Sequence, residues 1–228
     1  MVNKMKLSKA QLKRRLSIPL GLIRRIGLKN RDFTIISNNC WGGEIYDYFR
    51  LPYKSPTIGL WFPAYDYLKF ISNLDFYLKQ ELIQIDASEC HVYELMKKRY
   101  KEGRYKDPVE KMVIGRLYDV DIIFLHYQTF SDAKIKWDKR VQRINYNNLI
   151  VKNNDQNGFK TEYFYIFDDL DINGEKIFFT SNTSINSVNG STNVVLLNSE
   201  EHHEHVIDDT MLKLLPIDIK KILNNMKR

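Results

Sequence analysis

The chain has 228 residues, 43% of them hydrophobic and 28% charged, so it is long enough for one sizeable core and far from a disordered composition. Its net charge is +7, but residues 1–31 hold ten Lys or Arg and no Asp or Glu, which leaves 25 basic against 28 acidic residues, about −3, in the remainder. Nucleic-acid-binding domains carry basic charge on the folded body, so this distribution argues against nucleic acid as a partner.

Cysteine usage and hydropathy bear on the compartment. Two cysteines, Cys40 and Cys90, do not form a disulfide framework in a chain of this size. No stretch approaches the roughly 18 apolar residues of a membrane span, and the N-terminal region lacks the apolar core and cleavage site of a signal peptide. We therefore expect a cytoplasmic protein.

The domain organisation predicted is a basic arm, residues 1–31, followed by a single α/β domain, residues 32–228. Within the arm, apolar residues between Leu16 and Leu28 alternate with Arg24 and Arg25. Such a basic amphipathic segment can lie on anionic lipid, where each cation contributes on the order of 1 kcal/mol, and would place the protein on the inner face of the membrane. The alternative is an ordinary helix packed on the domain with its basic face in water.

In chain order, the pattern predicts a strand at residues 33–37, a helix at 44–49, a strand at 57–62 and the clearest helix at 65–82. It then predicts a helix at 94–100, strands at 113–117 and 121–127, and a helix at 132–144 capped by Ser131. The last elements are a strand at 149–151, a helix at 162–170, strands at 176–180 and 194–197, and a helical segment at 209–226 interrupted at Pro216. This alternation predicts an α/β fold with a mainly parallel sheet, or a mixed one, covered on both faces.

The first candidate site is the turn after the first strand, Ser37 to Gly43. Ligands in open parallel sheets bind beyond the carboxyl ends of strands, and a helix starting near Gly43 would offer backbone N–H groups to an anion. Near that positive helix end, Cys40 is a candidate nucleophile. The substrate-binding candidates in the turn are Asn38, Asn39, Trp41, Gly42 and Gly43. The turn is neither a dinucleotide fingerprint nor a P-loop, so the cofactor stays unknown, and the alternative is a structural turn with an inert cysteine.

The second candidate pair is His126 and Tyr127, at the end of the strongest predicted strand. If that strand runs parallel to the first, His126 reaches the same edge as Cys40 and is suited to act as a general base, with Tyr127 contacting the substrate. A lone histidine at a strand end is equally often a hydrogen-bonded structural residue.

The third candidate is a helix face that carries Trp137, Arg140 and Arg143 at spacings of three. An aromatic platform beside two guanidinium groups suits a sugar with its phosphate, which Arg binds in a bidentate fashion. The spacing alone favours the simpler alternative, a solvated basic face with Trp137 in the core.

A cluster of histidine and glutamate, Glu201 to His205, has the residue types that bind zinc. No complementary ligand spacing occurs elsewhere in the sequence, and the stretch is polar and loop-like. We therefore expect a surface loop and predict no metal site.

Four stretches of the chain are distinctive: FTIISNNCWGGEIYDYFRLPYKSPTIGLWF, DYLKFISNLDFYL, IIFLHYQTFSDAKIKWDKRVQRINYNNLIV and KIFFTS, which span about residues 32–181. In these stretches the chain resembles a known bacterial family, domain of unknown function 1919, whose members are often labelled exopolysaccharide-biosynthesis proteins. The resemblance implies a three-layer α/β/α fold of the Rossmann-like type and a role near capsule or exopolysaccharide assembly. It also gives weight to the first three candidate sites, which fall inside these stretches.

Together these features predict an acyl or glycosyl transferase whose substrate is a nucleotide- or lipid-linked sugar. Two alternatives stay open. One is an esterase or thioesterase that uses Cys40 and His126, and the other is a non-enzymatic sugar- or lipid-phosphate-binding protein held at the membrane by residues 1–31.

Overall fold

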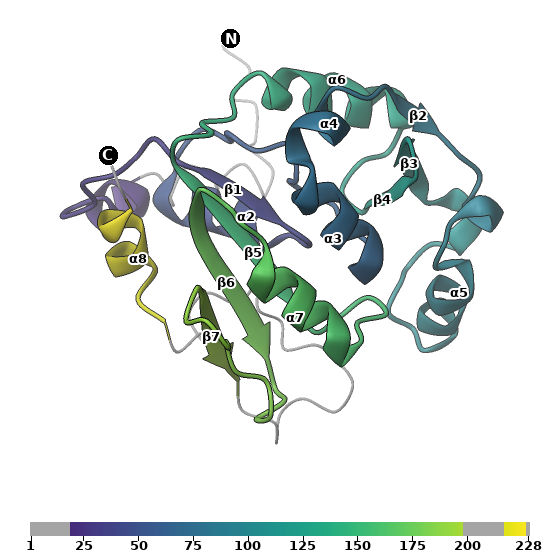
Figure 1. Cartoon of the computed structure of the whole chain (residues 1–228). Helices are drawn as coiled ribbons and strands as arrows, with labels where there is room; N and C mark the ends of the chain where they lie inside the picture. The colour runs from purple at the N-terminus through teal and green to yellow at the C-terminus, as the bar shows by residue number, and fades with distance from the viewer. Residues whose placement is uncertain (1–18, 198–216, 227–228) are drawn as a thin grey trace, which may run out of the picture.

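A computed structural model describes residues 19–197 and 217–226, which form two sheets with helices packed around them (Figure 1). Three predicted features lie outside the described residues. They are residues 1–18 of the arm, the loop at Glu201 to His205 and the start of the C-terminal helical segment. No helix within the described ranges has both the length and the apolar character needed to cross a membrane.

The larger sheet has four parallel strands in the order β1-β5-β6-β7. They are β1 (Thr34–Ser37), β5 (Leu149–Asn154), β6 (Gly174–Thr180) and β7 (Thr192–Leu196). Every residue of β1 and β5 is buried, as expected for strands of a parallel sheet covered on both faces. The prediction of an α/β fold with a mainly parallel sheet is confirmed.

Alternation along β1 divides the core into two layers. Ile35 faces α2 (Trp41–Phe49) and α8 (Ile219–Asn225), which share a cluster with apolar residues of β5 and β6. Ile36 faces the other cluster, which contains α3 (Ala64–Ser72) and α7 (Thr161–Asp169). The parallel sheet therefore lies between two helical layers (Figure 1), which is the predicted three-layer arrangement.

The smaller sheet is antiparallel, with the order β2-β3-β4, and was not predicted. Its strands are β2 (Leu82–Gln84), β3 (Val113–Leu117) and β4 (Val120–Phe124). His126 was placed beside Cys40 on the condition that the strand at 121–127 runs parallel to the first strand, and this condition is not met within one sheet. Strand β4 lies in the smaller sheet, where it pairs antiparallel with β3 across Tyr118 and Asp119. A two-residue connection joins antiparallel neighbours and leaves no room for the crossover that a parallel pair needs. Two further helices, α5 (Tyr93–Lys101) and α6 (Phe130–Val141), belong to this half of the molecule.

Three other predicted elements differ from the structure. Residues 57–62 form no strand and contribute only a bridge between Trp61 and Ile123 of β4. The predicted helix 65–82 is divided at Asn73 into α3 and α4 (Leu74–Leu78), and β2 follows. Helix α6 is capped by Thr129 rather than Ser131, since the Thr129 hydroxyl accepts a hydrogen bond from the Asp132 N–H at 3.2 Å.

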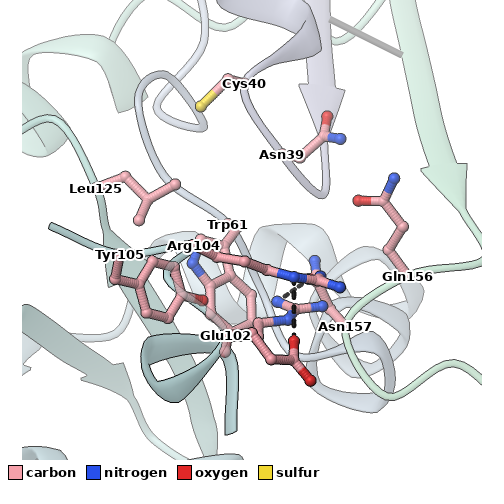
Figure 2. A pocket seen from close by; sticks show the side chains of 10 residues that line it. Asn39, Cys40, Trp61, Glu102, Arg104, Tyr105, Leu125, Gln156 and Asn157 are labelled. Atoms are coloured by element: carbon pink, nitrogen blue, oxygen red, sulfur yellow. Dashed lines mark hydrogen bonds and ion pairs between the residues drawn. The ribbon is translucent and has the colours of Figure 1, made fainter. Parts of the chain in front are cut away.

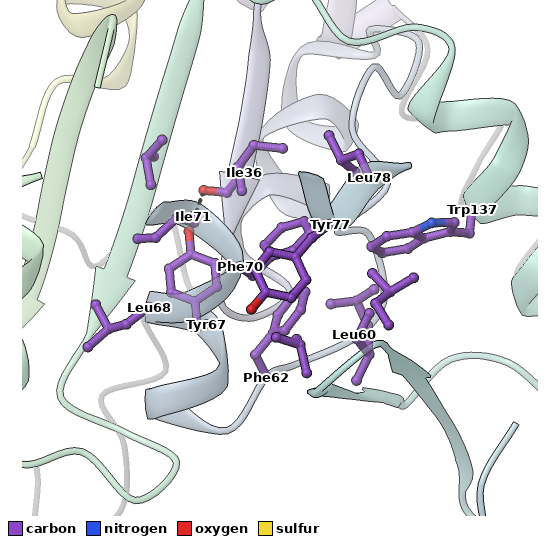
Figure 3. Close-up of a cluster of buried hydrophobic side chains, with 14 of the residues drawn as sticks. Ile36, Leu60, Phe62, Tyr67, Leu68, Phe70, Ile71, Tyr77, Leu78 and Trp137 are labelled. Atoms are coloured by element: carbon purple, nitrogen blue, oxygen red, sulfur yellow. Dashed lines mark hydrogen bonds between the residues drawn. The ribbon is translucent and has the colours of Figure 1, made fainter. Parts of the chain in front are cut away.

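One apolar cluster connects the two sheets. Figure 3 shows Phe62 and Phe70 between Ile36 of the parallel sheet and Trp137 of α6, with Tyr67 beside Ile36. The Tyr67 hydroxyl donates towards the carbonyl oxygens of Ile36 (2.9 Å) and Lys152 (2.8 Å), which lie on neighbouring strands. This packing sets the position of the antiparallel half against the carboxyl edge of the parallel sheet.

Candidate functional site

Two polar segments meet where β1 and β5 end, because parallel strands present their carboxyl ends at one edge of the sheet. Ser37 pairs in register with Lys152, so Asn38 and Asn39 lie beside the last residues of β5. Lys152 is 0% exposed, and its ammonium group donates to the side-chain oxygens of Asn38 (3.0 Å) and Asn39 (3.1 Å). A buried ammonium requires such partners, so this network holds both amides in fixed orientations.

The start of α2 is capped by its own turn. The Trp41 N–H donates to the side chain of Asn39 at 3.1 Å, and the Gly42 N–H donates to the Ser37 hydroxyl at 3.3 Å. The expectation that this helix end offers free N–H groups to an anion therefore fails at these two positions. A side chain on Gly42 would lie 3.1 Å from Ile35. The role of this glycine is therefore to let α2 pack closely on β1, and not to let a ligand approach the backbone.

Cys40 lies between two cavities. The larger, of about 490 Å³, opens between the carboxyl edge of the parallel sheet and the antiparallel half (Figure 2). It is lined by Asn39, Cys40, Trp61, Arg99, Glu102, Arg104, Tyr105, Leu125, Gln156 and Asn157. Two guanidinium groups, two aromatic rings and three amides thus face one space.

The contacts of Arg99 fix it in this cavity. Its guanidinium donates to the side-chain oxygen of Asn157 at 2.9 Å and lies 5.3 Å from the centre of the Trp61 ring. Arg104 lies 3.2 Å from Glu102, which balances part of the positive charge. Arg99 is therefore held in place by groups from both halves of the molecule.

The smaller cavity, of about 330 Å³, brings together five of the predicted site residues, Cys40, Gly43, His126, Tyr127 and Arg140. The reason differs from the predicted one, since His126 follows an antiparallel strand and its N–H donates to the Gly59 carbonyl at 3.1 Å. Gly59 has φ of +75°, and a side chain there would lie 3.2 Å from both His126 and Tyr127. The rest of its lining consists of Glu44, Asp47, Tyr53, Ile58, Gly59 and Lys136.

A polar chain crosses the floor of the smaller cavity. Arg140 donates to the Tyr127 hydroxyl at 2.6 Å, and that hydroxyl donates to the Ile58 carbonyl at 2.7 Å. Burial raises the pKa of Tyr127 although the charge of Arg140 opposes the shift. Burial and the neighbouring Asp47 raise the pKa of Tyr53 to about 12, so both phenols stay protonated and can donate hydrogen bonds at neutral pH.

Five predicted substrate contacts line neither cavity; they are Asn38, Trp41, Gly42, Trp137 and Arg143. Asn38 and Gly42 are buried within the turn itself. Trp41 is 1% exposed and Trp137 is 2% exposed; Trp137 packs against Phe70 and Phe124 because the apolar side of an amphipathic helix faces the core. Arg143 is exposed and reaches only the Tyr53 carbonyl, at 3.4 Å. Of the proposed Trp137–Arg143 face, only Arg140 lines a cavity.

The comparison with known families decides the classification. The model described as Domain of unknown function (DUF1919) matches residues 12–211. This chain belongs to the DUF1919 family. It is also 28% identical over 151 residues to an uncharacterized protein of Haemophilus influenzae, covering 66% of this chain and 63% of that relative, so the match spans less than two thirds of the relative's length.

Several residues of this DUF1919 site were missed from the sequence. Lys152 had a usable signal, since its strand ends in polar residues just as β1 does, and parallel strands bring such ends together. Arg99 and Arg104 had none, because their place depends on how the antiparallel half packs. Trp61 was assigned to a strand rather than to a cavity wall.

Among the described residues, one group of the DUF1919 chain has a set of metal-ligand types, Asp66, His91 and Asp121. The His91 Nδ1 lies 2.8 Å from Asp66 and 3.4 Å from Asp121. Arg116 already binds both oxygens of Asp121, at 2.6 and 3.1 Å, and Lys69 lies 3.6 Å from Asp66, so neighbouring cations balance both carboxylates. We interpret the group as a structural network that ties α3 to β4, and none of its members lines either cavity.

Proposed function

We propose that this DUF1919 protein is a transferase that acts on a nucleotide- or lipid-linked sugar in exopolysaccharide or capsule assembly. The observation that supports this most is the larger cavity beside Asn39 and Cys40, where cationic, aromatic and amide side chains converge. Its volume of about 490 Å³ suits a small-molecule substrate.

Each class of side chain in this cavity matches one part of such a substrate. Arg99 and Arg104 suit the phosphate groups, since guanidinium binds phosphate oxygens in pairs. Trp61 and Tyr105 offer flat apolar surfaces for a sugar or base ring. The amides of Asn39, Gln156 and Asn157 can donate to and accept from hydroxyl groups.

The smaller cavity would hold the second substrate, with Cys40 at the junction. In acyl transfer, the Cys40 sulfur adds to the acyl carbonyl while its proton passes to His126, and the leaving alcohol or thiol departs with that proton. The acceptor hydroxyl then attacks the thioester and gives its proton to His126. His126 passes this proton to the Cys40 sulfur, which is released as the thiol. In glycosyl transfer, His126 would accept the proton of the acceptor hydroxyl and no bond to Cys40 forms.

Mass spectrometry of the polysaccharide from a deletion strain tests the proposed function. We expect loss of one sugar or acyl substituent, restored by the wild-type gene. Unchanged glycan structure and substituents would contradict it. If variants that bind the sugar but have no turnover also restore the missing substituent, this would favour the non-enzymatic alternative, a sugar- or lipid-phosphate-binding accessory protein.

A second candidate function is a hydrolase that cleaves an ester or thioester with Cys40 and His126. The observation in its favour is that both residues line the smaller cavity together with Arg140, whose guanidinium group has further N–H donors suited to a carbonyl oxygen. Cys90 is the internal control, since burial and Asp121 raise its pKa to about 12. We expect iodoacetamide to label Cys40 faster than Cys90 and to abolish turnover; full activity of Cys40→Ala would exclude this mechanism.

A further inference from the structure

The N-terminal segment of the described chain has its polar and apolar sides reversed. Residues 19–24 are helical and continue through a turn to Leu28, which is buried with α2 and α8. In a surface helix, apolar side chains normally face the domain and charged ones face water. Here the two arginines face the domain and the large aliphatic side chains face outwards.

The inward side is anchored at the carboxyl end of α2. Arg24 donates to the Tyr48 carbonyl at 3.2 Å and stacks on the Tyr48 ring, and Arg25 donates to the Phe49 carbonyl at 2.5 Å. The last carbonyls of a helix lack partners within the helix and carry partial negative charge, so guanidinium groups stabilise them. A side chain on Gly21 would lie 2.2 Å from Arg50, so this close contact requires glycine.

Helix α8 holds the rest of the segment. Lys220 donates to the Ile26 carbonyl at 2.9 Å, and Asn224 contacts the backbone of Gly27 and Lys29 at 2.8 and 2.7 Å. These bonds use the backbone and leave the side chains of the segment outside. Its orientation is therefore fixed by contacts with two helices.

The outward side is a patch of aliphatic residues between 49% and 71% exposed, Leu20, Leu22, Ile23 and Ile26. Contiguous exposed apolar side chains of this kind mark an interaction surface. The charge around the patch indicates the partner. Lys29 and Arg31, which follow the segment in the chain, and Lys221 on α8 are all exposed. Residues 1–31 carry ten basic and no acidic residues.

We propose that this patch docks on an anionic lipid bilayer, with Leu22, Ile23 and Ile26 entering the boundary between headgroups and acyl chains. Aliphatic side chains bordered by cations are the pattern of interfacial membrane segments. Arg24 and Arg25 serve as anchors to α2, so lysines and Arg31 meet the lipid headgroups. The inference does not depend on the proposed transferase activity.

Vesicle flotation of the full chain tests this directly. We expect binding to vesicles of phosphatidylcholine and phosphatidylglycerol (3:1), weaker binding to phosphatidylcholine alone, and weakening by salt. The double variant Leu22→Ser/Ile26→Ser should bind the anionic vesicles at least about tenfold more weakly, because it lacks two aliphatic side chains that would enter the bilayer. Its melting temperature should be unchanged, since both side chains are exposed.

The matched control is Ile135→Ser/Val188→Ser, which removes two exposed aliphatic residues elsewhere on the surface and should bind as the wild type does. Equal binding by the Leu22→Ser/Ile26→Ser variant, or no binding of the wild type to anionic vesicles, would overturn the proposal. A concentration-dependent dimer that this variant abolishes, without vesicle binding, would identify a second copy as the occupant and overturn it too.

Discussion

The two walls of the larger cavity come from the two halves of the molecule and are built differently. The parallel wall consists of strand ends whose polar groups are locked together, as in the bonds of Lys152 to Asn38 and Asn39. The antiparallel wall presents long side chains from helix and loop, such as Arg99 and Tyr105. We infer that the parallel wall supplies a fixed frame and the antiparallel wall supplies the groups that select the ligand.

The largest expected effect comes from Lys152→Met, which keeps most of the side-chain volume and removes the charge. The variant leaves the oxygens of Asn38 and Asn39 buried without this donor, so we expect the free energy of unfolding to fall by about 3 kcal/mol. Urea denaturation measures the change, and Lys139→Met on the exposed surface should stay within about 0.5 kcal/mol of wild type. A denaturation midpoint equal to that of the control would show that the frame does not depend on this bond.

Gly59→Ala tests the junction between the walls. The residue has φ of +75° and its new methyl would meet His126 and Tyr127 at 3.2 Å, so we expect a loss of about 2 kcal/mol in unfolding free energy. The control is Gly190→Ala, because Gly190 has a similar φ of +69° but its new methyl would have no atom within 4 Å. We expect this variant to lose about 1 kcal/mol in unfolding free energy. Equal losses in the two variants would mean that contact with His126 and Tyr127 adds nothing.

Tyr127→Phe removes the hydroxyl that joins Arg140 to the Ile58 carbonyl. We expect a loss of about 1 kcal/mol in unfolding free energy, the usual net contribution of such hydrogen bonds. Thermal denaturation against Tyr118→Phe, at an exposed tyrosine, isolates the effect. A melting temperature unchanged in both variants would show that the floor of the smaller cavity is not held by this hydroxyl.

The smallest expected effect is a difference in pH dependence between the two halves. Burial alone would raise the pKa of Asp168, but hydrogen bonds from Ser187 and the Val188 N–H outweigh it and lower this pKa below its usual 3.8. The stability that its carboxylate contributes is therefore present above pH 3.8 and lost as pH falls through the lower value of the folded state. Burial raises the pKa of Asp66, so its contribution has the opposite sign and is lost as pH rises.

Unfolding free energies of wild type and Asp168→Asn between pH 6 and pH 3 measure this signature. The difference between the two proteins should be largest near pH 6 and should shrink in the most acidic samples. A difference that grows on acidification would contradict the assignment.

The parallel half was largely predictable from the sequence. In the antiparallel half, strands β3 and β4 and helices α5 and α6 were predicted close to their observed bounds, but β2 and the pairing into a separate sheet were not. Strands β1, β5 and β6 each contain a short apolar run (35–36, 149–151 and 177–179), so their type and approximate place follow from local pattern. The turn between β3 and β4 has Tyr118 at φ of 57°, without the glycine or asparagine that signals a hairpin, and the break at Asn73 has neither glycine nor proline. Those features are set by tertiary packing.

The structure brings some of the candidate site residues together, through contacts other than those predicted. The prediction placed Cys40 and His126 together through a parallel pairing that does not exist, and the structure brings them together through Gly59. Trp41 and Trp137 were assigned to the ligand although aromatic residues in helices most often pack in the core, which is where both lie. Burial is a property of the whole fold, so spacing within one helix could not decide it.

Calorimetric titration of the full chain with nucleoside diphosphate sugars and polyprenyl-phosphate sugars tests the central claim, that the larger cavity binds an anionic sugar derivative. We predict saturable binding of at least one of them by the wild type and by Lys101→Met, an exposed lysine on the same helix, and binding at least about tenfold weaker by Arg99→Met. No binding by the wild type, or equal affinity in Arg99→Met, would contradict the account.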